Sequence, residues 1–529
     1  MPLHLSPHRL MGAAISILAA FPASASAGWQ SFQPQRRTAS SCPDYSSYSA
    51  QPHGPYSSGP LKLPYMRPSE ECRTFKSPAV EKVISDLKSQ LKDPDLARLF
   101  ENTFPSTLDT TVKYFDPAQN LAFIITGRAS ADLQSAQWLR DTGNQFAHLY
   151  KLLPHDKNLQ ALVKAVINTE ARYISQYPYC GSFQPPPESG LAPSVNDWAT
   201  GVRVNPPVDN QTVFECKYEL DSLAGFLKIT RSYYANTKDS SFINDNWNAA
   251  MAQIVRVLFE QSQSSWSQDY QWVSYYNWTG TAGALSPMVP NSGNGEPKQA
   301  NGLVASSHRP SDDLCVFNFI TSDNAMMSVE LANVADMLAA IGAQRPLAKQ
   351  LRQYSETIKQ AVWAHTRAAN GIFAYETNGL GAQYIMDDAN VPSLVSLPYL
   401  GFLKRSDPTY QKTKAAMFSR ANPYYAAGKS FDGIGGPHVN ATYPWPMSQI
   451  SAIFGTDSDR EIKQRLALIL GSTSGLGLIH ESVSIYNGSS YTRPWFAWAN
   501  SYFAEMILDL AERKPALILK SGRPYRIGQ

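Results

Sequence analysis

About a dozen stretches of the sequence repeat apolar residues at intervals of three and four, the spacing of one buried face of an α-helix. Three connections between them, at 178–216, 265–322 and 371–389, are long and rich in Pro, Gly, Asn and aromatic residues. Loops of that length in a compact domain are usually functional or disordered. We therefore predict an all-α fold of helical hairpins closed into a ring, an (α/α)6 barrel, with a site on the loop-bearing face. An irregular helical bundle would show the same periodicity. The predicted helices are 78–101, 136–152, 157–176, 220–236, 242–263, 323–341, 345–368, 390–402, 408–420, 445–455, 459–471 and 495–513.

The N-terminus has the pattern of a secretory signal over residues 1–27, with an apolar core, LMGAAISILAAF, before the small residues Ala25-Ser26-Ala27. The core is shorter than the roughly 20 residues of a membrane-spanning helix, although an uncleaved anchor is the alternative. Residues 28–68 are rich in Ser, Pro, Gln and Tyr, which predicts a disordered or extended lead-in. No long linker divides residues 69–529, so we predict that they form one large catalytic domain.

Composition narrows the function classes. The net charge is +3 and Lys and Arg form no basic run, which argues against nucleic acid as a partner. Four N-x-S/T sequences, at Asn210, Asn277, Asn440 and Asn487, fit a secreted glycoprotein. Five cysteines allow up to two disulfides and leave the pairing open. We expect a secreted monomer that is not held in a membrane once the signal is removed.

Five short clusters combine acids with His, Arg, Asn and Trp in a way that ordinary helix surfaces do not. They are WLRD at 138–141, ELD at 219–221, HRPSDD at 308–313, DDAN at 387–390 and HES at 480–482. A sugar site needs carboxylates, Arg and Asn for the hydroxyls and an aromatic ring for the apolar face. Hydrolysis of a glycosidic bond needs two carboxyls, one as acid and one as base or nucleophile. Asp221 and Glu481 are plausible partners.

Each cluster also has a structural interpretation. Asp221 fits an N-terminal capping acid for the next helix, and Asp388 with Asn390 fits a helix start. Asp312 and Asp313 suit a solvated turn. Arg140 with Asp141 suits a local ion pair, and Glu481 an exposed loop. No histidines show the H-E-x-x-H spacing of a zinc site, and no G-x-S-x-G elbow is present. The first absence argues against a metal site and the second against an α/β-hydrolase. We also expect no cofactor.

Taken together, the clusters resemble glycoside hydrolase family 125, the exo-acting α-1,6-mannosidases, from about residue 75 to the C-terminus. The resemblance implies an (α/α)6 barrel, metal-independent hydrolysis with inversion, and removal of a non-reducing terminal α-1,6-linked mannose from mannan or mannose-rich oligosaccharides. The matching stretches are ITG at 125–127, WLRD, KYELDS at 217–222, HRPSDD, DDANVPSL at 387–394, GIGGPH at 433–438, YPWPMS at 443–448, HES, and FAWANSYFAEMI at 496–507.

The resemblance also assigns roles. It implies Asp221 as the general acid and Glu481 as the general base, with their carboxyls about 6.5–9.5 Å apart. We expect burial or nearby negative charge to raise the pKa of Asp221, with Glu219 and Asp141 as sources of that charge. The residues implied to bind sugar are Trp138, Arg140, Asp141, Glu219, His308, Arg309, Asp313, Asp388 and Asn390.

One departure affects the predicted sugar pocket. The family usually has T-G-D shortly before W-L-R-D, whereas Gly127 is followed here by Arg128, and Asp132 replaces the family's Asp only if the loop is lengthened. Two alternatives to an α-1,6-mannosidase therefore stay open. One is an (α/α)6 glycosidase for a different sugar or linkage, and the other is a carbohydrate-binding relative without activity.

Overall fold

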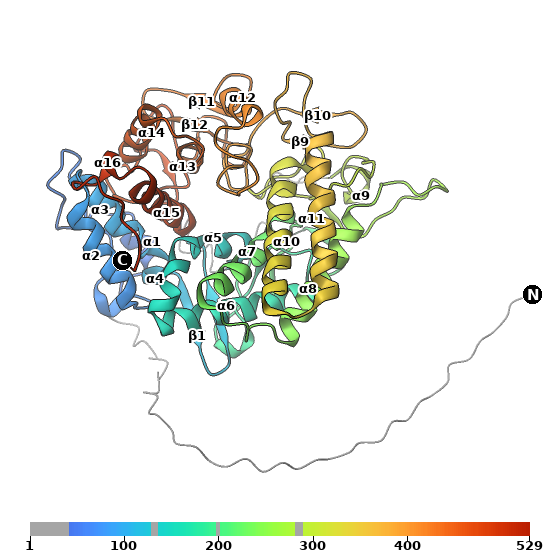
Figure 1. The fold of residues 1–529 in the computed structure, drawn as a ribbon, viewed down its shortest axis with the longest axis horizontal. Helices are drawn as coiled ribbons and strands as arrows, with labels where there is room; N and C mark the ends of the chain where they lie inside the picture. Colours follow the sequence, from blue (N-terminus) through green and yellow to red (C-terminus); the bar gives the residue numbers. More distant parts are fainter. Residues whose placement is uncertain (1–41, 128–135, 197–200, 281–288, 529) are drawn as a thin grey trace, which may run out of the picture. The chain divides into compact units, whose positions relative to one another are not determined.

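The structure, a computed structural model, describes residues 42–127, 136–196, 201–280 and 289–528. The predicted signal, the first part of the lead-in and Asp132 lie outside these ranges. Residues 42–529 form one compact unit. Its long helices follow one another round a ring in Figure 1, and the last of them, α15, packs against α3, α4 and α5 near the start of the chain. The helices are α1 (Tyr45–Tyr48), α2 (Pro78–Gln90), α3 (Pro94–Thr103), α4 (Ser106–Thr110), α5 (Leu139–Gln145), α6 (Lys157–Gln176), α7 (Leu220–Thr237), α8 (Asp245–Gln261), α9 (Pro290–Gly293), α10 (Thr321–Ile341), α11 (Arg345–His365), α12 (Pro408–Met417), α13 (Pro446–Phe454), α14 (Asp459–Gly471), α15 (Ala497–Arg513) and α16 (Pro515–Ile518), with 3-10 turns at Glu70–Cys72, Ala147–His155 and Pro187–Ser189.

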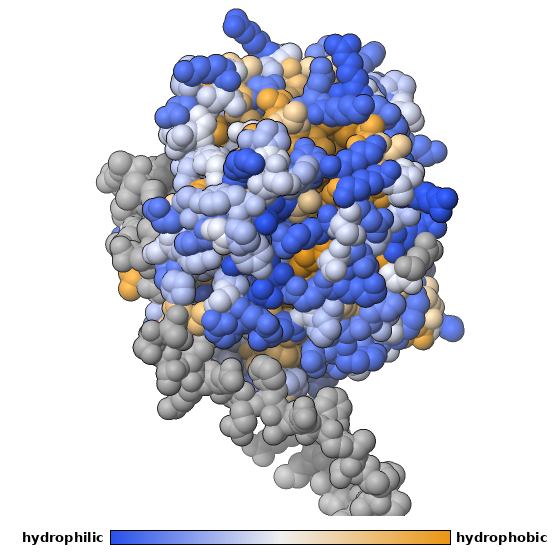
Figure 2. Space-filling view, turned by 90° about the vertical axis from the view of Figure 1, so that its left-hand side faces the viewer, coloured by the Kyte–Doolittle hydropathy of each residue, from blue (hydrophilic) through white to orange (hydrophobic). Residues whose placement is uncertain are grey.

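The ring has two layers because helices of two kinds alternate along the chain. The inner helices α5, α7, α10, α13 and α15 are buried along most of their length. Each is followed or covered by an amphipathic partner: in α11, for example, buried side chains recur at Leu351, Ser355, Ile358 and Val362, which lie on one helical face. Figure 2 shows the outcome on one side of the molecule, where hydrophilic residues cover most of the surface and apolar residues appear in hollows between them.

Local sequence signals explain where the helices begin. Asp156 accepts hydrogen bonds from the backbone N–H groups of Asn158 and Leu159 and so caps α6. Asp93 caps α3 in the same way, and Pro94 follows it at the first helical position. The predicted helix 78–101 is consequently divided into α2 and α3.

One predicted helix, 390–402, is wrong. The segment forms successive bends and turns, and the Tyr410 hydroxyl of α12 donates to its Val395 carbonyl at 3.0 Å. Asp387 holds it in this form, because its carboxylate accepts the backbone N–H groups of Leu394 and Val395, at 2.7 and 3.0 Å. Pro392 and Pro398 also lack the N–H that a helix interior needs. The apolar spacing correctly marked buried residues, since Leu394, Val395 and Leu397 are buried. The backbone N–H groups, however, bond to partners other than the carbonyls of a helix.

The compact unit also begins earlier than the predicted boundary at residue 69. A disulfide joins Cys42 to Cys72, and Leu63 and Met66 are buried. The Arg67 guanidinium forms a buried ion pair with Asp109 at 2.7 Å. The lead-in is therefore ordered from Cys42 onward, because its few apolar side chains have a place in the core that its composition does not reveal.

Short antiparallel strand pairs fix the long loops at one end of the ring. The strands are β1 (Val112–Asp116), β2 (Leu121–Ile124), β3 (Gln137–Trp138), β4 (Ser182–Phe183), β5 (Arg203–Asn205), β6 (Val213–Glu215), β7 (Asn277–Thr279), β8 (Phe319–Ile320), β9 (Glu376–Thr377), β10 (Gln383–Tyr384), β11 (Tyr425–Ala427), β12 (Asp432–Ile434), β13 (Ser482–Val483) and β14 (Tyr491–Thr492). They pair as β1-β2, β3-β4-β6, β5-β7, β8-β9-β10, β11-β12 and β13-β14. In the described ranges, no helix is both long enough and apolar enough to cross a membrane.

Candidate active site

A pocket of about 330 Å³ lies where the inner elements of the ring begin. Arg140 and Asp141 stand in the first turn of α5, Trp445 directly precedes α13, and Phe496 directly precedes α15. Because inner helices of a ring begin at the same end, residues far apart in sequence converge there. The lining consists of Thr126, Trp138, Arg140, Asp141, Ser311, Asp312, Asn390, His438, Trp445, Glu481, Arg493 and Phe496. It offers carboxylates, cations, an amide and aromatic rings, the set expected for a sugar.

Arg140 is the centre of the charge distribution. Its guanidinium lies 2.8 Å from the Glu219 carboxylate, 3.2 Å from Asp141, 3.6 Å from Asp312 and 3.8 Å from Asp221. All four are acids, and only the Asp312 side chain is appreciably exposed, at 22%. One buried cation cannot offset four carboxylates of which three are buried, so the cluster retains protons at neutral pH.

Asp221 lies in the first turn of α7 and is completely buried. Neither of its oxygens has a hydrogen-bond partner in the described chain, so it does not cap the helix through a side-chain bond. Burial raises the pKa of its carboxyl to about 7; Arg140 opposes the shift, while Asp312 and Asp141 add to it. The expected rise is therefore present, with burial as its main cause. Asp221 does not line the pocket.

The carboxyl groups of Glu219 and Asp312 form a pair within hydrogen-bonding reach of each other. Burial raises the pKa of Glu219 well above its usual range, and Asp312 and Asp221 add to the rise against Arg140. Burial acts on Asp312 in the same direction, but Arg140 and Lys217 outweigh it and hold the pKa of Asp312 below its usual range. The proton of the pair accordingly resides on Glu219 and the charge on Asp312, which faces the pocket.

Glu481 belongs to the loop before β13 and lines the pocket from the far end of the sequence. The Arg493 guanidinium lies 2.8 Å from its carboxylate. Arg493 comes from the turn after β14, and β13 pairs with β14 through Ser482 and Thr492. The short hairpin therefore fixes the distance between the base candidate and the Arg493 guanidinium.

Comparison with known proteins identifies the family. The model of the metal-independent α-mannosidases, GH125, matches residues 93–508, which is most of the chain. The chain belongs to glycoside hydrolase family 125. The predicted family is thus confirmed.

Two relatives extend this match. The chain is 44% identical over 491 residues to the meiotically up-regulated gene 157 protein of Schizosaccharomyces pombe, covering 91% of this chain and 95% of that protein. It is similar in structure to a metal-independent α-mannosidase of Streptococcus pneumoniae, solved as a non-productive complex with α-1,6-mannobiose. The TM-score is 0.72 and the identity 26%, over 82% of this chain and 99% of the other. The predicted (α/α)6 barrel is confirmed with the family.

Five of the predicted site residues of this family 125 enzyme line the pocket: Trp138, Arg140, Asp141, Asn390 and Glu481. Asp388 does not line the pocket itself, but it accepts a hydrogen bond at 2.7 Å from the hydroxyl of Ser311, which does. Asp313 similarly lies 3.6 Å from the His438 ring. Glu219 contacts the pocket-lining Arg140 and does not line the pocket itself. Its neighbour Lys217 forms an ion pair with Glu215 at 2.8 Å. These residues position the groups that line the pocket.

Arg309 and His308 do not line the pocket. The Arg309 guanidinium forms a buried ion pair with Glu376 at 2.5 Å, and Glu376 also accepts the backbone N–H groups of Val316 and Phe317. Arg309 thus fastens its loop to β9. His308 is buried and packs edge-on against Trp278. Its main-chain N–H donates to the Tyr218 carbonyl, so it links its loop to KYELDS.

Several pocket residues were missed as site candidates. Ser311, Asp312, His438, Trp445 and Phe496 all lie inside the stretches that carried the family resemblance, and those stretches were the available signal. Asp312 has a left-handed backbone, with φ of 70°, which a non-glycine residue adopts only when its surroundings demand it. Arg493 lies in no such stretch, and nothing in its sequence neighbourhood marks it.

Proposed function

We propose that this chain is an exo-acting α-1,6-mannosidase that releases the non-reducing terminal mannose with inversion of configuration. The observation that carries the proposal is one small pocket lined by Glu481, Asp312, Arg140 and three aromatic rings in a confirmed family 125 chain. The twelve residues that line it come from separate segments and converge on one place, which suits a single terminal sugar. The linkage follows the α-1,6-mannobiose bound by the Streptococcus pneumoniae relative.

The pocket residues divide the work of holding one mannose. Trp138, Trp445 and Phe496 offer apolar ring faces to the sugar. Asp141, Asn390 and Arg140 offer hydrogen bonds of both senses to its hydroxyls. Because Arg140 is already tied to four acids, its orientation is set before the sugar arrives, which reduces the entropy lost on binding.

Glu481 acts as the general base. Its carboxylate takes a proton from a water molecule, and the water oxygen attacks the anomeric carbon on the face opposite the leaving group. The bond to the glycosidic oxygen breaks as that oxygen receives a proton from the acid. The α-mannoside yields β-mannose, and the acid and base exchange one proton with water to return to their starting forms.

Two carboxyls are candidates for the acid. The family resemblance assigns it to Asp221, whose pKa of about 7 suits a donor near neutral pH. Its buried position outside the pocket lining favours instead Asp312, which can contact the glycosidic oxygen. We propose that the proton shared by Glu219 and Asp312 passes to the leaving oxygen through Asp312. Asp221 then acts behind Arg140, where its neutral form limits the negative charge of the cluster.

The test is hydrolysis of α-1,6-mannobiose beside its α-1,2 and α-1,3 isomers and α-linked glucose disaccharides. We expect the α-1,6 isomer to be cleaved fastest and proton NMR to show β-mannose as the first product. Release of glucose without mannose would support a different sugar specificity. No hydrolysis of any substrate, with binding retained, would support the carbohydrate-binding alternative. The α anomer as first product would rule out Glu481 as a base acting through water.

We also propose that the protein is secreted as an N-glycosylated monomer that acts on mannan or mannose-rich glycans. Support comes from the signal pattern of residues 1–27, the two disulfides and the exposure of Asn210, Asn440 and Asn487. N-terminal sequencing of the mature protein should begin at Gly28. Endoglycosidase treatment should lower its mass, and light scattering should give one chain. An N-terminus at Met1 on a membrane-bound protein would contradict secretion.

A further inference from the structure

A second pocket, of about 470 Å³, lies beside the segment that precedes α7. It shares no lining residue with the candidate active site. Its walls come from Tyr218, from the loop that carries Trp272, Tyr275 and Tyr276, and from the loop that carries Asn294 and Lys298. We call it the aromatic pocket.

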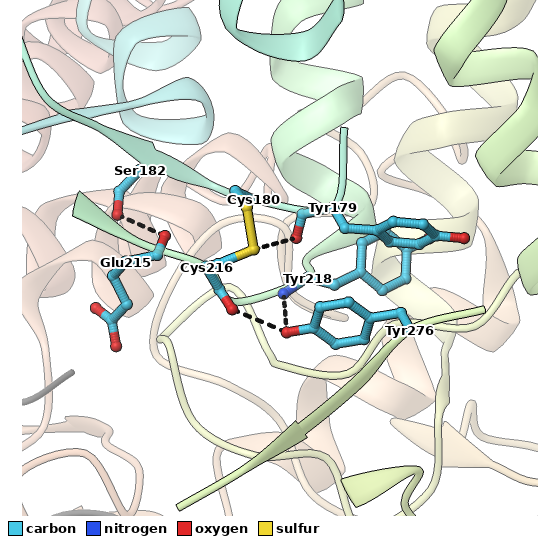
Figure 3. Close-up of a disulfide and its surroundings, with 7 residues drawn as sticks. All are labelled: Tyr179, Cys180, Ser182, Glu215, Cys216, Tyr218 and Tyr276. Atoms are coloured by element: carbon cyan, nitrogen blue, oxygen red, sulfur yellow. Dashed lines mark hydrogen bonds between the residues drawn. A yellow bond between two sulfur atoms is a disulfide. The ribbon is translucent and has the colours of Figure 1, made fainter. Parts of the chain in front are cut away.

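A disulfide stiffens one wall of the aromatic pocket (Figure 3). Cys180 is bonded to Cys216, two residues before Tyr218. The Tyr276 hydroxyl donates to the Cys216 carbonyl at 2.9 Å and accepts the backbone N–H of Tyr218 at 3.2 Å. Tyr179 packs against both tyrosine rings. The pocket is therefore held by covalent and hydrogen-bonded contacts, which a preformed ligand site requires.

Two buried hydrogen-bond donors and one half-buried lysine side chain of the aromatic pocket have no partner within the described ranges. The Tyr218 hydroxyl and the Trp272 indole N–H are buried and have no partner within the described ranges. The Lys298 ammonium likewise forms no hydrogen bond or ion pair there, and burial lowers its pKa to about 8. Buried donors without partners are uncommon in folded proteins because each costs free energy. Two such donors in one pocket, beside a lysine without an ion-pair partner, indicate a ligand rich in acceptor atoms.

The aromatic pocket has one positive charge that no acid of its lining neutralises. Among the described residues that line it, Lys298 is the only cation and Glu260 the only carboxylate. Glu260 is already engaged, because the Tyr179 hydroxyl donates to it at 2.6 Å and the Arg256 guanidinium lies 2.9 Å away. The positive charge of Lys298 is therefore left for the ligand.

Aromatic side chains surround the opening. Trp272 packs edge-on against Trp266, with ring centroids 4.7 Å apart, and Trp266 is 49% exposed. Tyr275 is also partly exposed, at 36%. Exposed aromatic rings beside polar donors provide the apolar face and the hydrogen bonds that a sugar ring needs.

We propose that the aromatic pocket is a second, non-catalytic binding site for an anionic saccharide, a sugar that carries a phosphate or a carboxylate. Lys298 binds the anionic group, and Tyr218 and Trp272 donate to acceptor oxygens of the same ligand. The sugar ring lies against the aromatic side chains. Such a site would hold a charged part of a glycan while the active site removes mannose elsewhere.

The test measures binding by isothermal titration calorimetry to the full chain carrying Glu481→Gln, so that the result does not depend on hydrolysis. The probes are mannose 6-phosphate, glucuronic acid, methyl α-mannoside and inorganic phosphate. We expect one or both anionic sugars to bind, and methyl α-mannoside and inorganic phosphate to bind at least about tenfold more weakly at this pocket. Lys298→Gln should weaken binding of the anionic sugar about tenfold, and Trp272→Phe, which keeps the packing on Trp266, should weaken it severalfold.

The matched control is Lys349→Gln, which removes an exposed lysine of α11 far from either pocket. It should bind as the parent does, and thermal unfolding should show that all variants are folded. The proposal is overturned if neither anionic sugar binds, if inorganic phosphate binds as well as they do, or if Lys298→Gln has no more effect than Lys349→Gln. The proposed function and the second site can fail independently. If the parent chain has no mannosidase activity but binds the probes as expected, the proposed function is refuted and the second binding site is supported.

Discussion

The two pockets of this molecule are built in opposite ways. The candidate active site is formed by residues at the starts of inner helices, and its charged groups are paired around Arg140. The aromatic pocket is formed by long loops, and its donors are left unpaired. In the first, four acids stand within 3.8 Å of one guanidinium and share charge and protons. In the second, the Lys298 ammonium has no ion-pair partner within the described ranges. The two sites thus differ in whether the protein pairs its own charged groups.

The largest effect should come from Glu481→Gln. Removal of the base should lower kcat on α-1,6-mannobiose by about 10³-fold, because the attacking water loses its proton acceptor. Binding of mannose 6-phosphate at the aromatic pocket should not change. A kcat within tenfold of that of the parent would show that Glu481 is not the general base. The first pocket would then no longer differ from the second by containing that base.

Arg140→Met should be the most damaging substitution for folding. It leaves Asp141, Glu219, Asp221 and Asp312 without the cation that they share, and breaking a buried ion pair costs about 3–5 kcal/mol. Denaturant unfolding measures this loss. The matched control is Arg352→Met, whose ion pair with Asp336 is exposed and should matter by less than about 1 kcal/mol. Equal losses in the two variants would mean that Arg140 does not organise the site.

Comparison of Asp312→Asn with Asp221→Asn should identify the acid. On α-1,6-mannobiose, loss of the direct donor should lower kcat by about 10²-fold. On 4-nitrophenyl α-mannoside, whose leaving group needs little protonation, the same variant should lose much less. We expect this leaving-group pattern for Asp312→Asn. If Asp221→Asn shows it instead, the donor is Asp221 and the cluster must rearrange when substrate binds.

The smallest effect concerns stability and pH. The folded-state pKa of Asp221, about 7, is above that of the unfolded chain. Between about pH 4 and 7 the unfolded state therefore releases a proton that the folded state retains, and stability falls as pH rises through this window. Asp221→Asn removes this loss. Its Tm should exceed that of the parent by about 2–4 °C at pH 8 and match it at pH 4, as measured by scanning calorimetry. A higher Tm at pH 4 only would contradict the raised pKa.

Much of the fold, and five of the residues that line the candidate site, could be predicted because the signals are local. Trp138, Arg140, Asp141 and Glu481 lie in short clusters at element boundaries, where the chain order already places them on one face. The choice between Asp221 and Asp312 could not be predicted. Spacing shows that an acid stands at a helix start but not whether its side chain faces the pocket or the core.

Other features depended on contacts that no pattern records. The turns at 390–402 follow from the backbone bonds made by Asp387, and apolar spacing alone gave a helix. Arg493 became part of the site only because β13 pairs with β14. The aromatic pocket combines residues of three segments that are separated in sequence. The length of the connections predicted that these loops are functional, but it did not predict which ligand they bind.

The closure of the ring has a consequence for biosynthesis. The Thr107 hydroxyl, near the start of the ring, bonds with Ser501 of α15 across 394 positions, and Phe496 completes the pocket that Arg140 begins. During translation, the first helices leave the ribosome long before the residues that they must contact. A fragment that ends before residue 496 lacks one wall of the pocket. We therefore expect a premature stop codon before that position to leave an inactive product rather than a weaker enzyme.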